Sequence, residues 1–452
     1  MKIVVQGFGV VGAATALNIA SSNNFKNNFK VHCIEKKSPE GSQKIFMAQR
    51  GLFPIKTSDK SLGQALEKAL NKNRISFGLN IRDYSKADIV IVTINCDLKS
   101  NNSINLKDFL SSFKDIVNNI SPNTLILVES TVPPGTCEKL LYPIMKKILK
   151  RRSIKQSKVF LAHSFERVTP GNNYLNSCKN AYKVFSGINK ESEKRCYNFI
   201  KKIVNYKKFP PVKLDNTLSS ETCKLMENSY RALNIAFVDE WVKFSEKLKL
   251  DLFSIISSIK MRNTHKNLML PGIGVGGYCL TKDPVFAKIA AKKIFNFKNN
   301  KFPLSSHAVS INKNMPNTSF IFIKKNIKFS LKNKKILFYG ITYKEDIGDI
   351  RFSPSIYLAK KLIKQKSDVY FYDPLIKEVE EKKIKYFDIE RKKIKFDIEI
   401  LAVKHQDFLS KKFMNKLSST KAIIFDLNNV LNNKRIVKLK KTKSNIFVLG
   451  RQ

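Results

Sequence analysis

The sequence is poor in cysteine and gives its cysteines no regular spacing. Its 452 residues include seven cysteines, which form no CxxC pair and no cluster with histidine. This argues against a disulfide framework and a zinc site, and for a reducing compartment. No stretch approaches the ~20 uninterrupted apolar residues of a membrane span. The N-terminus also lacks a signal-peptide pattern. We therefore predict a soluble cytoplasmic protein with no metal and no membrane partner.

Acidic residues are scarce: 36 Asp and Glu stand against 83 Lys and Arg, for a net charge of +47. Such an excess raises nucleic acid as a partner. However, the basic residues are spread over the whole length, and short basic runs such as 146–152 and 434–443 contain no aromatic residues. We interpret the charge as solvated faces with a general attraction for anionic small molecules, and we expect no nucleic-acid partner.

Apolar runs alternate with amphipathic stretches in two regions of the chain. The length suits two to three domains, and a hydrophobic content of 43% supports a globular protein. Such alternation is typical of an α/β fold with doubly wound parallel sheets covered by helices. Between the two regions, residues 218–259 contain hardly any proline or glycine and predict long helices in a central domain. The strand-like runs are 3–5, 31–34, 89–94, 125–128 and 159–162, then 335–340, 369–372, 398–403 and 422–425.

A glycine pattern near the N-terminus predicts a dinucleotide site. Gly7, Gly9 and Gly12, with Val10 and Val11 between them, follow a short apolar strand and open an alanine-rich helix. The glycines permit a tight turn, approach of the pyrophosphate and close packing of helix on strand. Glu35, at the end of the next strand, can accept both ribose hydroxyls. This favours NAD, although Lys36 and Lys37 beside it would tolerate a 2′-phosphate.

A second glycine-rich segment, 272–283 (GIGVGGYCLTKD), surrounds one cysteine. Glycines such as Gly276 let a ligand approach the backbone, the ammonium of Lys282 would favour a thiolate at Cys279, and Asp283 can take a proton. A glycine turn with a buried cysteine is the competing interpretation. Combined with a redox cofactor, the segment predicts covalent catalysis at Cys279.

Together with both glycine segments, four further stretches make the chain resemble the UDP-glucose/GDP-mannose dehydrogenase family over nearly its whole length. The resemblance implies two Rossmann-like domains joined by a central helical domain, with predicted boundaries at 1–205, 206–315 and 316–452. It also implies a homodimer or higher oligomer formed through the long helix. The stretches are 129–136 (ESTVPPGT), 164–171 (SFERVTPG), 221–224 (ETCK) with 228–231 (NSYR), and 340–344 (GITYK) with 349–354 (DIRFSP).

The resemblance implies oxidation of the C6 alcohol of a UDP-sugar to a carboxylate by two NAD+, for surface polysaccharide synthesis. In this mechanism Cys279 forms a thiohemiacetal and then a thioester. Lys224 and Asn228, one helical turn apart, are implied donors to the oxyanion and contacts to the sugar. Asp283 is implied in the proton transfer of the first oxidation and Glu166 in thioester hydrolysis.

The remaining implied contacts concern the cofactor and the substrate. Thr131 is placed near the nicotinamide, with a helix N-cap as its ordinary alternative, and Lys282 is predicted to contact the cofactor. Without the resemblance, Glu166 would be interpreted as a surface ion pair with Arg167. The predicted substrate contacts are Arg167, Gly276, Lys344 and Arg351, with Arg262 reaching the sugar from a partner subunit.

The chain departs from the family pattern in places that bear on the sugar. Residues 93–96 (TINC) stand where Thr-Pro is common, and His163-Ser164 replaces a proline before the glutamate. Pro170 occupies the position of a second acid found in UDP-glucose enzymes, which favours a UDP-N-acetylhexosamine. In contrast, many enzymes of the N-acetylhexosamine branch lack the lysine found here at Lys282. Two alternatives stay open: a two-electron dehydrogenase of the 6-phosphogluconate or 3-hydroxyacid type, and a basic NAD-sensing regulator that binds nucleic acid.

Overall fold

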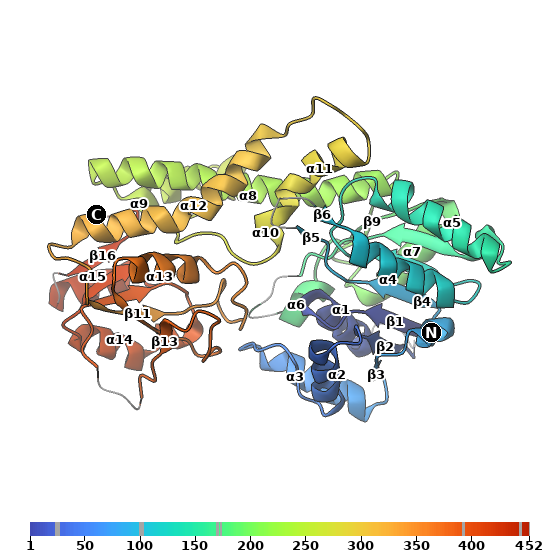
Figure 1. The fold of residues 1–452 in the computed structure, drawn as a ribbon, viewed down its shortest axis with the longest axis horizontal. Helices are drawn as coiled ribbons and strands as arrows, with labels where there is room; N and C mark the ends of the chain where they lie inside the picture. Colours follow the sequence, from blue (N-terminus) through green and yellow to red (C-terminus); the bar gives the residue numbers. More distant parts are fainter. Residues whose placement is uncertain are drawn as a thin grey trace. The chain divides into compact units, whose positions relative to one another are not determined.

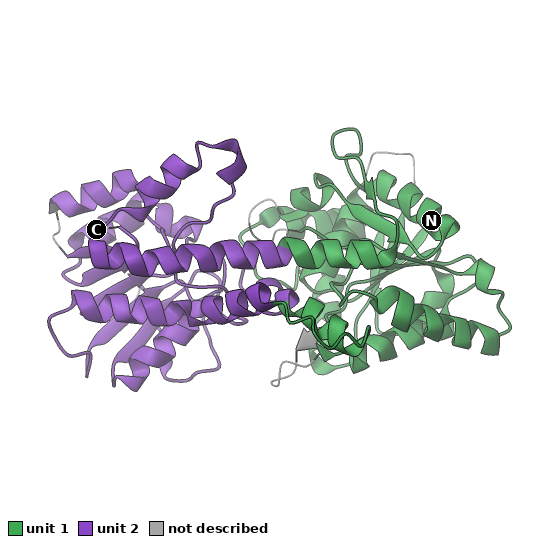
Figure 2. Cartoon of the chain, turned by 90° about the horizontal axis from the view of Figure 1, so that it is seen from above, with its two compact units in different colours: residues 1–227, 285–302 green, residues 228–284, 303–452 purple. Residues whose placement is uncertain are grey.

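The computed structural model describes residues 1–22, 28–98, 104–168, 171, 174–390, 394–442 and 445–451. The chain forms two compact units (Figure 2): residues 1–227 with 285–302, and residues 228–284 with 303–452. The division into three domains stays a prediction. Among the described residues, none of the helices is both long enough and apolar enough to cross a membrane.

The first unit contains an eight-stranded sheet with strand order β10-β9-β8-β7-β4-β1-β2-β3 (Figure 1). From β3 to β8 it follows the 3-2-1-4-5-6 order of dinucleotide-binding sheets, and the predicted parallel pairing is confirmed there. The sequence pattern did not predict strands β3, β9 and β10. Strand β9 pairs antiparallel to β8. The strands are β1 (Lys2–Gln6), β2 (Lys30–Ile34), β3 (Ile75–Gly78), β4 (Ile89–Val92), β7 (Leu125–Val128), β8 (Phe160–His163), β9 (Val184–Gly187) and β10 (Val212–Lys213), with a separate hairpin of β5 (Asp97–Leu98) and β6 (Ile104–Asn105).

Both faces of the central strands of this sheet are buried, because alternate residues of these strands enter different apolar clusters. Ile3 and Val5 pack with α1, α3 and α7 on one face, whereas Val4 and Val90 pack with α4 and α5 on the other. Full burial of such a side chain contributes roughly 2 kcal/mol. The helices of this unit are α1 (Val10–Ser21), α2 (Pro39–Gln49), α3 (Lys60–Asn71), α4 (Lys107–Asn119), α5 (Tyr142–Arg151), α6 (Tyr174–Lys179), α7 (Lys190–Ile203) and α11 (Phe286–Lys293), with the π-helical turn η2 (Thr136–Leu141) before α5.

The second unit contains a six-stranded, entirely parallel sheet in the order β13-β12-β11-β14-β15-β16. This is again the 3-2-1-4-5-6 arrangement, so both predicted doubly wound sheets are confirmed. Helices α12 and α13 cover one face, and α14 and α15 the other. The elements are β11 (Lys335–Tyr339), β12 (Asp368–Tyr372), β13 (Ile384–Tyr386), β14 (Ile398–Leu401), β15 (Ile423–Asp426), β16 (Ile446–Val448), α9 (Leu252–Ile259), α10 (Cys279–Lys282), α12 (Pro303–Asn326), α13 (Pro354–Lys364), α14 (Lys411–Ser419) and α15 (Asn433–Thr442).

The predicted long helix is α8 (Thr217–Leu248), which begins in the first unit and ends in the second. Lys249, directly after it, has a φ of 59°, a left-handed conformation that ends the helix. Asp251 then caps α9 by accepting hydrogen bonds from the backbone N–H groups of Phe253 and Ser254. The region without proline and glycine therefore forms one long and one short helix.

Candidate active site

The first glycine loop has the geometry that the dinucleotide pattern predicts. Gly7 has a φ of 95°, and a Cβ on Gly12 would lie 2.0 Å from the carbonyl oxygen of Gly7, so both positions need glycine. In contrast, a Cβ on Gly9 would meet no atom within 4 Å. Since Gly9 precedes the first residue of α1, this open backbone lies where a pyrophosphate binds a helix N-terminus. The residues present therefore fit NAD.

Glu35 follows β2, beside the glycine loop. Its Oε1 accepts a hydrogen bond from the backbone N–H of Phe8 at 2.6 Å and lies 3.5 Å from the Nζ of Lys44. Because β1 and β2 are neighbours in the parallel sheet, their carboxyl ends bring this acid to the loop. The carboxylate is thus fixed where a ribose contact requires it, and the contact itself stays a prediction.

Glu166 lies in a buried ion cluster in the first unit. Its Oε2 pairs with the Nζ of Lys183, and Lys183 also pairs with the Oε1 of Glu129 at 3.0 Å. The interpretation as a surface ion pair with Arg167 is wrong: the guanidinium of Arg167 pairs with Glu227, and only its backbone N–H donates to Glu166. No role was predicted for Lys183, because its contact to Glu166 depends on the antiparallel strand β9.

Lys224 lies beside the same segment. Its Nζ donates to the backbone carbonyl of Glu166 at 3.1 Å and lies 5.3 Å from the centroid of the Phe165 ring. One turn earlier on α8, Glu221 accepts hydrogen bonds from the N–H groups of Gly135 and Cys137 at 2.6 and 2.8 Å. Burial raises the pKa of Glu221 to about 7. These contacts hold α8 against the loop after β7.

Thr131 lies in that loop, directly after the strand end at Val128 and the pair Glu129-Ser130. The interpretation as a helix N-cap is wrong, because the helical turn η2 begins after Gly135, whose φ of 88° requires a residue without a Cβ. Thr131 is therefore free of a capping role, and its position near the nicotinamide stays a prediction.

In the second unit, Cys279 is the exposed cysteine among the seven and begins α10. The glycines before it serve packing within the protein. A Cβ on Gly276 would lie 2.6 Å from the Cβ of Tyr343, and Gly277, with a φ of 72°, donates its N–H to the carbonyl of Arg351 at 2.9 Å. The expected approach of a ligand to Gly276 stays a prediction, while the structure shows why these residues are small.

Asp283 is 1% exposed and accepts two charged or polar side-chain donors. The Nδ2 of Asn228 donates to its Oδ2 at 2.7 Å, and the Nζ of Lys282 donates to its Oδ1 at 3.1 Å. The ammonium of Lys282, expected to favour the thiolate of Cys279 or to contact the cofactor, thus has Asp283 as a partner. The structure places Cys279, Asn228 and Asp283 in the second unit and Lys224, Glu166, Thr131 and the first glycine loop in the first.

Two predicted substrate cations lie on the loop after β11. Tyr278 directly precedes Cys279 in the sequence. The guanidinium of Arg351 lies 4.2 Å from the centroid of the Tyr278 ring, and the Nε of Arg351 donates to Asp349 at 2.9 Å. Burial lowers the pKa of Lys344. This loop and the cysteine loop are therefore packed together, which brings two predicted substrate contacts close to the predicted nucleophile.

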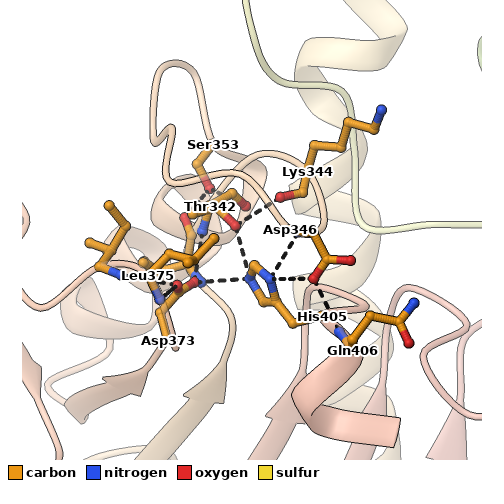
Figure 3. Close-up of polar contacts among 10 residues, drawn as sticks. Thr342, Lys344, Asp346, Ser353, Asp373, Leu375, His405 and Gln406 are labelled. Atoms are coloured by element: carbon orange, nitrogen blue, oxygen red, sulfur yellow. Dashed lines mark hydrogen bonds and ion pairs between the residues drawn. The ribbon is translucent and has the colours of Figure 1, made fainter. Parts of the chain in front are cut away.

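A buried network around His405 supports the same loop (Figure 3). The Nε2 of His405 lies 3.2 Å from the Oδ2 of Asp373 and 3.1 Å from the Oγ1 of Thr342. On the other side of the ring, the backbone N–H of Asp346 lies 3.0 Å from Nδ1 and the carboxylate of Asp346 lies 3.6 Å away. The side chain of Lys344 points away from this network. The network thus holds the loop in place, while the ammonium of Lys344 lies outside the network. Sequence reasoning missed His405.

Two influences compete at the imidazole ring of His405. The N–H of Asp346 needs an unprotonated nitrogen, whereas the carboxylates of Asp346 and Asp373 favour the imidazolium. Burial opposes the charge, but these two acids outweigh it and raise the pKa of His405 to about 9.

This raised pKa predicts a pH-dependent contribution to stability. Because the unfolded pKa is about 6.5, the stabilisation is complete below that value and is lost as the pH rises through about 9. We expect thermal or urea unfolding to show that His405→Gln is less stable than the wild type at pH 6. This difference should shrink by roughly 3 kcal/mol at pH 10. A difference that does not change with pH would contradict the assignment.

The remaining predicted site residues are placed as follows. Arg262 is exposed and precedes a short 3-10 turn at Asn263–His265, and its contact to a partner subunit stays a prediction. Pro170 lies outside the described residues. Among the described residues, no group of histidine, cysteine and acidic side chains is arranged to hold a metal ion.

Comparison with protein families matches three models along the chain. Residues 1–208 match the NAD binding domain of the UDP-glucose/GDP-mannose dehydrogenase family, residues 218–314 its central domain, and residues 337–433 its UDP binding domain. The cofactor that the first unit binds is therefore NAD.

Several similar proteins are named UDP-N-acetyl-D-mannosamine dehydrogenases. A UDP-N-acetyl-D-mannosamine dehydrogenase of Methanococcus vannielii is 30% identical over 454 residues, covering 95% of this chain and 93% of that protein. One from Methanocaldococcus jannaschii is 30% identical over 382 residues, covering 82% and 79%. The solved UDP-D-ManNAc dehydrogenase of Pyrococcus horikoshii shares the fold, with a TM-score of 0.81 and 22% identity over 100% of this chain and 99% of that one.

Proposed function

This chain belongs to the UDP-glucose/GDP-mannose dehydrogenase family, and we propose that it oxidises C6 of UDP-N-acetyl-D-mannosamine to the carboxylate with two NAD+. As in its relatives, the activity is that of an NAD-dependent UDP-sugar dehydrogenase. The observation that carries the four-electron form is the exposed Cys279, four residues before the buried carboxylate of Asp283 and packed against the loop of Lys344 and Arg351.

The first oxidation removes the proton of the C6 hydroxyl and a hydride from C6. NAD+, held by the loop of Gly7, Gly9 and Gly12 with Glu35, supplies the hydride acceptor when bound. Asp283 takes the hydroxyl proton through a water that Lys224 orders. Burial of Asp283 with Asn228 and Lys282 as donors keeps its carboxylate oriented for this transfer.

The second oxidation starts from a covalent adduct. The sulfur of Cys279 adds to the aldehyde carbon, and Lys224 and Asn228 donate hydrogen bonds to the developing oxyanion. Asn228 is presented from α8 at the required helical spacing, and it exchanges its bond to Asp283 for one to the oxyanion. Oxidation of the thiohemiacetal gives a thioester, which water hydrolyses with Glu166 as the base.

The sugar is tested with purified protein, NAD+ and a panel of UDP-sugars followed at the NADH absorbance. We expect UDP-N-acetylmannosamine to give the highest kcat/KM, ahead of UDP-GlcNAc, UDP-GalNAc and UDP-glucose. A clear preference for UDP-glucose would overturn the substrate assignment but not the reaction. The product would serve surface polysaccharide synthesis, and loss of the uronic acid from surface glycans in a deletion strain would support this role.

The panel also separates the alternatives. A two-electron dehydrogenase would release one NADH for each sugar and would not depend on Cys279. A nucleic-acid-binding regulator would show salt-sensitive binding to duplex DNA and no turnover of UDP-sugars. Matches to the central and UDP-binding family domains favour the UDP-sugar dehydrogenase.

We further propose that α8 forms a homodimer contact. From Tyr230 onward it exposes a stripe of large apolar side chains at heptad-like spacing, which soluble helices rarely present to water. The stripe consists of Tyr230, Phe237, Trp241, Phe244 and Leu248.

Replacing Trp241 with glutamate is expected to convert the dimer to a monomer at micromolar concentration. A buried aromatic anchor is worth about 2 kcal/mol or more at an interface, so the dissociation constant should rise roughly 30-fold or more. Light scattering after size-exclusion chromatography measures the mass. Phe46→Glu, which changes an exposed aromatic on α2, is the matched control and should leave the mass unchanged. A dimer that persists in the Trp241 variant would place the contact elsewhere.

A further inference from the structure

One buried lysine joins the predicted hydrolytic glutamate to a second acid. Lys183 is 2% exposed, and its Nζ contacts the Oε1 of Glu129 at 3.0 Å and the Oε2 of Glu166. Each carboxylate has one further donor. Thr15 of α1 donates to the Oε2 of Glu129 at 2.9 Å, and the backbone N–H of Arg167 donates to the Oε1 of Glu166 at 2.8 Å. The cluster thus links the cofactor-binding helix to the residue proposed as the base.

Sheet topology explains why these side chains meet. Glu129 follows β7 and Glu166 follows β8, which are parallel neighbours, so both acids lie at one edge of the sheet. Strand β9 is antiparallel to β8, with His163 opposite Ser186, and its first residue follows Lys183. Continuing this register places Lys183 opposite Glu166. The antiparallel strand therefore delivers a cation to an edge that otherwise holds two acids.

The charge of this cluster matters because its three side chains are almost entirely buried. With both acids ionised, one ammonium leaves a net charge of −1 in the interior, which is costly. Burial raises the pKa of Glu129, and the two acids raise the pKa of Lys183 although burial alone would lower it. A proton added to Glu166 would make the whole cluster neutral. Because Glu129 shares Lys183, the ammonium does not offset the charge of Glu166 alone.

We propose that Lys183 and Glu129 are positioning residues for thioester hydrolysis, acting through Glu166. The inference rests on the proposed function. A water oxygen attacks the thioester carbon, and its proton passes to Glu166. The tetrahedral intermediate then collapses, the C–S bond breaks with its electron pair leaving on the sulfur of Cys279, and the acid product departs. Glu166 returns its proton to solvent. Lys183 fixes the carboxylate of Glu166, while Glu129 prevents the ammonium from neutralising it alone.

The sharpest test is Glu129→Gln, which changes one charge and almost no volume. Lys183 then pairs with Glu166 alone, and a proton on Glu166 would leave a buried cation. We expect hydrolysis to slow roughly 10-fold or more while both oxidations proceed. Stopped-flow should show a burst of two NADH per active site before a slow phase. Intact mass of acid-quenched protein should show the adduct on Cys279.

A double variant separates charge from structure. Lys183→Met with Glu129→Gln leaves Glu166 as the one charged group, so protonation again gives a neutral cluster. Hydrolysis should be faster than in Glu129→Gln but slower than in the wild type, because Lys183 no longer fixes the carboxylate. Asp239→Asn, which alters a buried acid paired with Lys243 at 2.7 Å on α8, is the control and should give no burst.

The outcomes keep this inference distinct from the proposed function. Hydrolysis at the wild-type rate in Glu129→Gln, or equal loss of the burst and of hydrolysis, overturns the role of the cluster. If the double variant hydrolyses the thioester no faster than Glu129→Gln alone, the net charge of the cluster does not control hydrolysis. Absence of NADH formation by the wild-type protein with any UDP-sugar would instead overturn the proposed function.

Discussion

Replacing Cys279 with alanine is expected to stop uronic acid formation, with a loss in kcat of roughly 10³-fold or more. Without the sulfur, the aldehyde has no nucleophile to form the adduct from which the second hydride leaves. The variant should still bind the UDP-sugar, because Lys344 and Arg351 are untouched, and should form at most one NADH per active site. Carboxylate product and NADH are measured together over a single turnover.

Cys223→Ala is the matched control for this experiment. Cys223 is the partly exposed cysteine on α8, and burial raises the pKa of its thiol, which disfavours a thiolate. Its variant should keep kcat within about two-fold of the wild type. If Cys279→Ala produces the uronic acid at the wild-type rate, the covalent mechanism is wrong.

Asp283→Asn is expected to lower kcat by roughly 10²- to 10⁴-fold, the range of a lost proton acceptor. The amide has nearly the same shape, but it carries no charge and cannot take the hydroxyl proton. Because the step affected is the first oxidation, single-turnover experiments should show slow formation of the first NADH and no accumulated thioester. The affinity for the UDP-sugar, measured by calorimetry, should stay near that of the wild type.

Folding must be checked separately for this variant, since Asp283 is buried and paired with Lys282 at 3.1 Å. Loss of the acid leaves a poorly hydrated ammonium, which lowers stability. A thermal midpoint still well above the assay temperature shows that the kinetic loss is chemical. A fast first NADH in Asp283→Asn would remove this residue from the proton transfer.

Sequence patterns correctly predicted the cofactor loop, because its turn and helix are determined by residues that are neighbours along the chain. The turn at Gly7, the helix after Gly9 and the acid at Glu35 follow one another along the chain, and neighbouring parallel strands bring them together. The sequence could not reveal Lys183, because its contact to Glu166 depends on strand β9 running opposite to β8. It also suggested Arg167 as the partner of Glu166, since adjacency in sequence was the only information on pairing.

His405 shows the same limit in the second unit. It follows β14, and its partners lie on the loop after β11 and at Asp373 after β12, so three segments far apart in sequence meet at one edge of the sheet. The glycines at 276 and 277 were expected to admit a ligand. That expectation stays a prediction. The contacts to Tyr343 and the hydrogen bond to Arg351, which only the folded loop reveals, give these glycines a further reason to be small.

The two sheets also explain why the second unit would not bind a dinucleotide as the first does. Asp373 occupies the position after β12 that Glu35 occupies after β2. However, its carboxylate accepts the N–H groups of Ile341 and Leu375 at 2.8 and 2.9 Å and contacts His405. Asp373 is also 1% exposed, whereas Glu35 is only partly buried. The sequence of this unit matches a UDP binding domain.

We propose that one protein carries C6 through two oxidations by way of a sulfur adduct. The decisive experiment counts the NADH formed for each UDP-N-acetylmannosamine consumed by the wild-type protein at completion. We expect two NADH and a C6 carboxylate product. One NADH for each sugar, with an aldehyde or ketone as the product, would contradict it.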